Sequence, residues 1–168
     1  MTNIVFATLA VLLCFAAEAS AQPNVTFDSP FQVRTATKIK KGDLLNITNT
    51  GATNTNLCAH VYAFDGGGQM LACCSCVVAP NALRSLSVGT DVFEGAKPPK
   101  SGIFKVLAST VVGGTCNGAA PGALSTGLVA SRNDLSFIPA TLSAGELTNL
   151  QMRCLSLHAV ANICPLCR

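Results

Sequence analysis

The alternation of apolar and polar side chains along the chain predicts a protein built mostly from β-strands. Its clearest element is a pair of apolar runs, 57–65 and 69–78, separated by three consecutive glycines. Glycine adopts the positive φ angles that tight turns require, so these runs are expected to form a β-hairpin. Apolar side chains occupy both faces of the hairpin, which predicts a central position covered on both sides.

Shorter apolar patterns, bounded by loops rich in Gly, Pro and Asn, predict further strands along the chain. The alternation of apolar and polar residues over 82–88 is typical of a half-buried strand. A Lys41–Gly42 turn follows the first strand. Besides the hairpin, the expected strands cover residues 32–38, 43–49, 82–88, 103–112 and 128–132.

One helix is predicted near the end of the chain. Ser143 and Glu146 have the spacing of a capping box, and Leu142 and Leu147 that of a hydrophobic staple. Apolar residues then recur at helical spacing, which predicts one buried face. Cys154 lies on this face, so its thiol is expected to point toward the sheet. The buried face comprises Leu147, Leu150, Cys154, Leu157 and Ala161.

These elements together predict a mainly β fold. We expect an antiparallel, β-sandwich-like domain of about seven strands, stapled by disulfides, with one C-terminal α-helix packed across it. The mature chain has the length of one ordinary domain, so residues 22–168 are expected to form a single β-rich unit.

The first residues predict export. Residues 4–17 are almost wholly apolar, yet this run is shorter than the ~20 apolar residues that span a bilayer. It is followed by Ala19-Ser20-Ala21, the small-x-small pattern that a signal peptidase recognises. We therefore expect residues 1–21 to be a signal peptide and the mature protein to be secreted or periplasmic, with no transmembrane segment. A lipid anchor on Cys14 is disfavoured because Leu13 precedes it where a small residue is required.

Composition narrows the classes of partner. The formal net charge is +3, and the basic residues are dispersed apart from two groups, Lys38, Lys40 and Lys41, and Lys97 and Lys100. The chain has no Trp and one Tyr, whereas single-stranded nucleic-acid sites are built from stacking aromatic rings. We expect a solvated basic surface and no nucleic-acid partner. The partner is unknown, with another extracellular protein or a cell-envelope component as the candidates.

The cysteines indicate a disulfide framework. Of nine cysteines, Cys14 falls in the signal segment, which leaves an even number in an exported chain. Eight cysteines allow 105 pairings, so the sequence does not give the connectivity. Cys73 and Cys74 point to opposite faces of one strand and should have different partners. The expected disulfide residues are Cys58, Cys73, Cys74, Cys76, Cys116, Cys154, Cys164 and Cys167.

The hairpin also offers an alternative metal site. If the three glycines form its loop, Cys58 lies opposite Cys76 and His60 opposite Cys74, with all four side chains on one face. Three thiolates and one imidazole are a known zinc-ligand set. Because export favours oxidation, we prefer a Cys58–Cys76 disulfide, with Cys74 bonded to the C-terminal tail and His60 merely packed or hydrogen-bonded. A shift of one residue in the register would remove the shared face.

No other motif assigns an enzyme class. Cys164-Pro-Leu-Cys167 has C-x-x-C spacing but follows a helix, so a structural staple is favoured over a redox site. Cys154 and His158 share a helix face, yet the even cysteine count argues against a free nucleophilic thiol. Hydrolase, dinucleotide and P-loop motifs do not occur. We expect a non-enzymatic structural or interaction module without a cofactor; a metal-binding or thiol-redox protein, and then a secreted hydrolase, are the alternatives.

Three segments carry a resemblance. They are Leu57-Cys-Ala-His-Val-Tyr-Ala-Phe-Asp, Met70-Leu-Ala-Cys-Cys-Ser-Cys and the C-terminal Cys-Pro-Leu-Cys-Arg. The chain resembles secreted bacterial proteins of uncharacterised function over most of its mature length, mainly through the Cys-Cys-x-Cys hairpin and the terminal C-x-x-C. This resemblance implies an exported protein, but it implies no activity and no functional residue.

Overall fold

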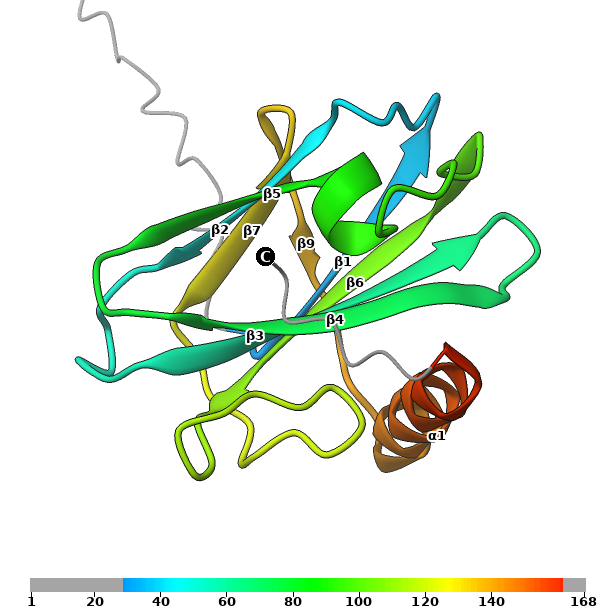
Figure 1. The fold of residues 1–168 in the computed structure, drawn as a ribbon. Helices are drawn as coiled ribbons and strands as arrows, with labels where there is room; N and C mark the ends of the chain where they lie inside the picture. Colours follow the sequence, from blue (N-terminus) through cyan, green and yellow to red (C-terminus); the bar gives the residue numbers. More distant parts are fainter. Residues whose placement is uncertain (1–28, 162–168) are drawn as a thin grey trace, which may run out of the picture.

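Two antiparallel β-sheets packed face to face, with one helix on the outer face of the larger sheet, make up the fold (Figure 1). The computed structural model describes residues 29–161. The expected mainly β, sandwich-like architecture with a C-terminal helix is confirmed. The predicted signal peptide and the predicted disulfide residues Cys164 and Cys167 lie outside the described residues. No helix within 29–161 is long and apolar enough to cross a membrane.

The larger sheet has the strand order β4-β3-β6-β1-β9 and the smaller sheet the order β5-β2-β7-β8. The larger sheet contains β1 (Phe31–Thr37), β3 (Leu57–Asp65), β4 (Met70–Val78), β6 (Ser101–Thr110) and β9 (Ile138–Pro139). The smaller contains β2 (Leu44–Asn49), β5 (Leu83–Ser87), β7 (Leu128–Arg132) and β8 (Leu135–Ser136). A π-helical turn, η1 (Val88–Val92), follows β5, and the helix is α1 (Ala144–Ala161).

Every predicted strand is present, with ends within two residues of those expected. Two strands, β8 and β9, are not predicted by the sequence pattern, because two residues are too few to show an alternation. The Lys41–Gly42 turn does not close a hairpin. It carries the chain from β1 in one sheet to β2 in the other.

The sheets enclose the main hydrophobic core, and the helix encloses a second one. Alternate residues of each strand face the partner sheet, so the main core takes side chains from both sheets. It includes Leu45, Ile47, Leu57, Val61, Phe104 and Leu128. The outer face of the larger sheet packs against α1 through a smaller cluster that includes Phe31, Tyr62, Phe64, Leu107, Leu150 and Cys154. The hairpin is therefore covered on both faces, as its composition predicts, but its expected central position is wrong, because β4 is the edge strand of the larger sheet.

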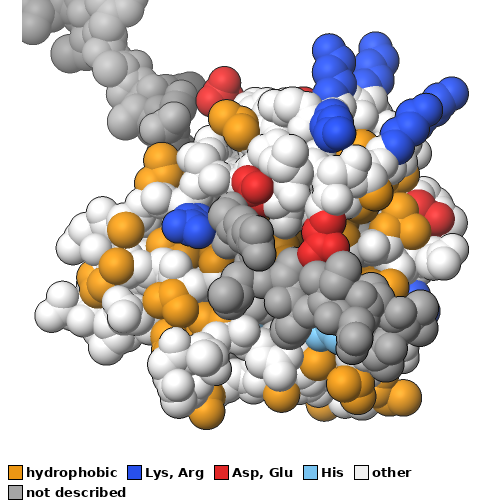
Figure 2. Space-filling view, viewed as in Figure 1, with side chains coloured by type: hydrophobic (Ala, Val, Ile, Leu, Met, Phe, Trp, Pro, Cys, Tyr) orange, Lys and Arg blue, Asp and Glu red, His pale blue; other side chains and the backbone are white. Residues whose placement is uncertain are grey.

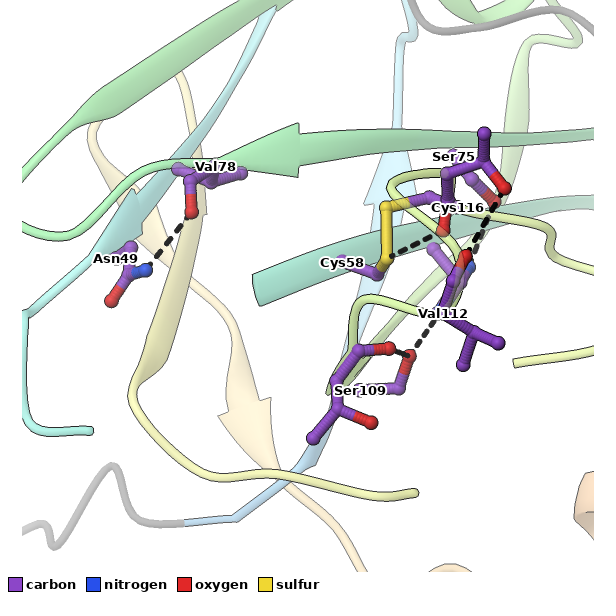
Figure 3. The surroundings of a disulfide bond; sticks show 10 residues. Asn49, Cys58, Ser75, Val78, Ser109, Val112 and Cys116 are labelled. Carbon is purple, nitrogen blue, oxygen red and sulfur yellow. Dashed lines mark hydrogen bonds between the residues drawn. A yellow bond between two sulfur atoms is a disulfide. The ribbon is translucent and has the colours of Figure 1, made fainter. Parts of the chain in front are cut away.

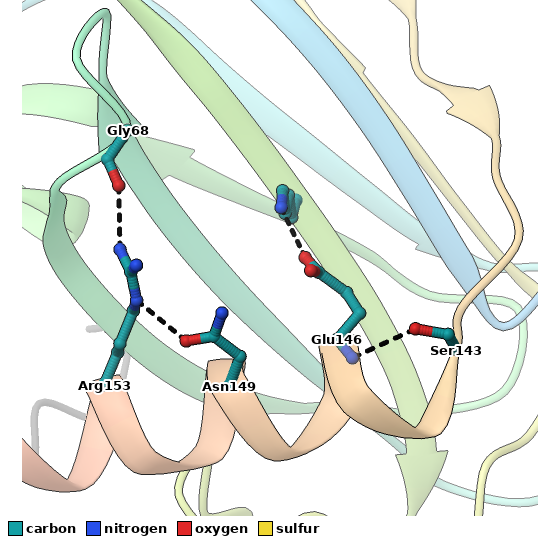
Figure 4. Close-up of polar contacts among 6 residues, drawn as sticks. Gly68, Ser143, Glu146, Asn149 and Arg153 are labelled. Atoms are coloured by element: carbon teal, nitrogen blue, oxygen red, sulfur yellow. Dashed lines mark hydrogen bonds and ion pairs between the residues drawn. The ribbon is translucent and has the colours of Figure 1, made fainter.

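The helix begins as the capping box predicts. The Glu146 N–H donates to Ser143 Oγ at 3.1 Å. The Glu146 carboxylate does not complete the box, because it pairs with the amine of Lys105 on β6 (Figure 4). One end of the helix is thus tied to the sheet by an ion pair, and its buried face by Leu150 and Cys154.

The register of the hairpin differs from the predicted one. Phe64 lies opposite Met70, as a three-glycine loop predicts, but the pairing then shifts by one residue. Leu71 is the extra residue of this β-bulge, and beyond it Cys58 lies opposite Val77. The shift turns every side chain of β4 beyond the bulge to the face opposite to the expected one.

Candidate functional site

The four side chains of the predicted zinc site do not share a face. Cys74 and Cys76 belong to the core between the two sheets. Cys58 and His60 alternate with the core residues of β3 and therefore point to the outer face. The sheet itself separates the two pairs, so they form no common metal site. The Cys58–Cys76 disulfide is likewise excluded, because Cys58 is bonded to Cys116.

The outer face instead holds a polar row across three strands. His60 Nδ1 lies 2.8 Å from Ser75 Oγ on β4, and its Nε2 lies 2.8 Å from Ser109 Oγ on β6. All three side chains are buried, and His60 is 0% exposed. Figure 3 shows Ser75 and Ser109 beside the Cys58–Cys116 disulfide. Both ring nitrogens are satisfied, as burial of a polar group requires.

The surroundings of His60 keep its ring neutral. Burial lowers the pKa of His60 from 6.5 to about 4. The Ser109 hydroxyl also donates to the Thr110 carbonyl, so its oxygen is left to accept a proton from Nε2. Nδ1 then accepts the hydroxyl proton of Ser75, an assignment made from the hydrogen-bond network. Neither partner is a carboxylate, the group that stabilises the imidazolium of a serine hydrolase. His60 is therefore a weak base whose ring is held between two hydroxyl groups.

A loop over residues 116–122 covers this polar row. Tyr62 Oη donates to the Gly118 carbonyl at 2.9 Å. A Cβ on Gly118 would lie 2.8 Å from Cys73 Sγ and 3.1 Å from Ser75 Oγ, so only glycine allows this approach. The Cys58–Cys116 disulfide fixes the start of the loop. The His60 ring is therefore shielded from solvent beneath this loop.

The cysteines divide between the two faces. On the outer face, Cys58–Cys116 joins β3 to the covering loop, and Cys73–Cys154 joins β4 to α1. On the inner face, Cys74 is disulfide-bonded. Its partner is not that of Cys73, which is bonded to Cys154, so the two neighbours have different partners, as expected. Cys76 is a free, buried thiol, although the sequence predicts a disulfide there. Burial raises the pKa of Cys76 to about 11, so its thiol stays protonated at neutral pH.

The helical Cys–His pair is present but carries no nucleophile. Cys154 Sγ lies 3.6 Å from His158 Nε2, as their spacing on one helix face predicts. Cys154 is disulfide-bonded to Cys73, so its sulfur is not a free thiolate. Potential ligand atoms of Cys73, Cys154 and His158 nevertheless all lie within 4.8 Å of one another. Sequence reasoning missed this cluster because Cys73 lies far from the helix along the chain.

Two surface hollows lie beside these elements. A cavity of about 140 Å³ between α1 and the tip of the hairpin is lined by Lys105, Glu146 and Arg153. Its charges are already engaged, since Lys105 pairs with Glu146, and Arg153 donates to the Gly68 carbonyl at 2.8 Å (Figure 4). The second, of about 230 Å³, adjoins Cys58 and is lined mainly by small and hydroxyl side chains. Lys105 and Glu146 offset each other's charge, whereas Arg153 bonds to two neutral acceptors, Asn149 Oδ1 and the Gly68 carbonyl, and keeps its positive charge.

Most side chains on the outer face that could act as bases, nucleophiles or ligands are therefore engaged in hydrogen bonds, disulfides or an ion pair. The histidine is held by two hydroxyls, Cys58, Cys116, Cys73 and Cys154 form disulfides, and Lys105 pairs with Glu146. Comparison with known proteins gives no family: no family model, no curated protein and no solved structure matches the chain.

Proposed function

We propose that this chain is an exported, non-enzymatic structural or interaction module of the extracellular space or the cell envelope. One observation carries the proposal. The most catalysis-like group, His60 between Ser75 and Ser109, is sealed under a disulfide-pinned loop, and burial disfavours its charged form. The outer face is thus organised for rigidity, which suits a domain that presents a fixed surface to a partner.

Two features support export. The apolar segment before Ala19-Ser20-Ala21 has the form of a signal peptide. The Cys58–Cys116 and Cys73–Cys154 disulfides belong to a class of bond that forms and persists in oxidising compartments.

Processing of the full chain in a bacterial host tests the export proposal. We expect the natively purified protein to begin at Gln22 by intact mass. A non-reducing peptide map should contain the Cys58–Cys116 and Cys73–Cys154 linked peptides. A protein that keeps residues 1–21, or in which these four cysteines react with an alkylating agent before reduction, would contradict export.

An active-site probe tests the non-enzymatic part. A fluorophosphonate reacts with serine hydroxyls that a neighbouring base activates. We expect Ser75 and Ser109 to stay unlabelled, at or below the background of the exposed Ser85. A known serine hydrolase serves as the positive control. Stoichiometric labelling of Ser75 or Ser109 would replace the proposal with a hydrolase.

A second candidate function rests on the cluster of Cys73, Cys154 and His158. A dithiol reductant would give two electrons and two protons to the Cys73–Cys154 disulfide and become a disulfide itself. A Zn²⁺ ion would then displace the protons of the two thiols and take the imidazole as a third ligand. In this candidate the metal would bind between the hairpin and the helix, because Cys73 lies on β4 and Cys154 and His158 lie on α1. These ligands differ from the four expected from the sequence.

Zinc titration after phosphine reduction tests this candidate. The background carries Cys58→Ala and Cys116→Ala, which removes the other outer-face sulfurs. We expect a metal site to show tight, one-equivalent binding that weakens at least tenfold in His158→Ala and is absent before reduction. Binding that His158→Ala leaves unchanged would discard the candidate.

A further inference from the structure

Lysine side chains are concentrated in two loops of this chain. Five of its six lysines lie within residues 38–41 and 97–100. These segments are far apart in the sequence and were expected to form ordinary solvated surface. All five side chains are exposed: Lys38, Lys40, Lys41, Lys97 and Lys100.

The fold brings the two loops together at one end of the sandwich. The Ile39 N–H donates to the Lys100 carbonyl at 3.2 Å, and Lys41 Nζ donates to the Gly95 carbonyl at 3.3 Å. In Figure 1 the β1–β2 connection and the segment before β6 lie beside each other at the top. Figure 2, drawn from the same side, shows Lys and Arg side chains projecting together from that end. We call these five residues and their two loops the lysine end.

Nearby acidic groups leave the lysine end positive. Asp43 lies beneath the first loop, but it accepts from the Lys40 N–H and from Asn133 Nδ2 and pairs with Arg132 at 3.3 Å. Asp91 accepts from the Ser87 N–H at 2.7 Å. Glu94 is exposed and lies three residues before the second loop. The carboxylate of Asp43 thus holds the lysine-bearing loop in place while Arg132 offsets its charge.

We propose that the lysine end docks on an anionic phospholipid surface. The proposal rests on the interaction role proposed above and names its partner. Amines that project from two adjoining loop tips suit a flat layer of headgroup phosphates. Ile39 and Phe93 are buried, so contact would be electrostatic, without insertion of an apolar side chain.

Other polyanions fit this end less well. The loops expose no aromatic ring for base stacking and no arginine for bidentate phosphate contacts. The two hollows described above are lined by residues of other segments than these two loops. Lysine amines act as point charges, and an anionic lipid surface attracts such charges through its surface potential without specific geometry.

Vesicle co-sedimentation of the mature protein tests the proposal. We expect binding to phosphatidylcholine vesicles that contain phosphatidylglycerol, and none to phosphatidylcholine alone. Binding should disappear near 1 M salt, where the Debye length falls to about 3 Å. Each lysine at an anionic surface contributes about a five-fold change in partition coefficient. The variant Lys40→Gln, Lys97→Gln, Lys100→Gln should therefore bind at least tenfold more weakly.

Charge removal elsewhere is the matched control. The variant Arg34→Gln, Arg84→Gln, Arg153→Gln removes the same charge from residues outside the two loops, and its folding is checked by circular dichroism. Lys41 is kept in both variants because its amine bonds to Gly95. We expect this control to bind vesicles within about three-fold of the unmodified protein, because local charge density decides the affinity.

Three results would overturn the proposal. They are equal weakening by the two triple variants, no dependence on phosphatidylglycerol, and retention on a DNA duplex without vesicle binding. Any of them would leave the non-enzymatic, exported module standing with another partner. Fluorophosphonate labelling of Ser75 or Ser109 would instead refute the function and leave the vesicle result to be judged by itself.

Discussion

Cys73 on β4 is disulfide-bonded to Cys154 on α1, across 81 residues of sequence. Leu150 is the one other buried side chain among the helix residues whose burial is described, 144–158. The bond therefore fastens the helix to the outermost strand of the larger sheet, and the covering loop sits against its sulfurs through Gly118.

Removing this bond should release the helix. The double variant Cys73→Ala, Cys154→Ala is expected to lose about 2–5 kcal/mol in free energy of unfolding, measured by urea denaturation. Amide hydrogen exchange should accelerate in α1 more than in the 116–122 loop. In the control Cys58→Ala, Cys116→Ala, exchange should instead accelerate in that loop. Identical exchange patterns in the two variants would contradict the separate roles.

The buried, neutral His60 ring should make the folded protein less stable in acid. Its pKa is lowered from 6.5 to about 4 by burial, so between these pH values the unfolded chain binds a proton that the folded chain does not. Stability from the neutral ring is full above pH 6.5 and falls as the pH drops toward 4, by about 3 kcal/mol.

Urea denaturation at pH 7 and pH 4 measures this loss in the unmodified protein and in His60→Gln, which cannot gain a proton. The variant should lose about 3 kcal/mol less than the unmodified protein over this range. An NMR titration of the His60 ring provides a second measurement should the variant fold poorly. A ring that becomes protonated near pH 6.5 in the folded protein would refute the prediction.

Gly118 should tolerate no side chain. A Cβ there would meet Cys73 Sγ at 2.8 Å and Cys154 Sγ at 3.1 Å, and these atoms are held by their disulfide. Gly118→Ala is expected to cost about 1–3 kcal/mol of stability because it overpacks a buried site. Gly42→Ala is the matched control, since no atom lies within 4 Å of its added Cβ. Equal midpoints of thermal unfolding for the two variants would count against this close contact.

Cys76 should be inert in the folded protein. Burial raises its pKa to about 11, and its side chain lies in the main core, so neither thiolate nor reagent is available. Iodoacetamide at pH 8 should leave the Cys76 peptide unmodified until the protein is unfolded. Cys76→Ala identifies the peptide in the mass spectrum. Rapid alkylation of Cys76 under native conditions would show that this thiol is accessible.

Several features followed from the sequence because they depend on near neighbours. The hairpin strands, the turn glycines, the Ser143 cap and the buried helix face all arise from local periodicity and local hydrogen bonds, which a linear pattern records. The burial of Cys154 against the sheet followed for the same reason.

The candidate site depended on contacts between distant segments, which the tertiary structure alone decided. The bulge at Leu71 moved Cys74 and Cys76 away from Cys58, because register depends on packing across the whole sheet. Loop 116–122 reached Cys58, and α1 reached Cys73, only after the sheet had placed them side by side. Likewise, two separate lysine groups became one charged end because Ile39 bonds to Lys100. Local patterns determined the elements of this protein, while long-range packing determined which of their side chains meet.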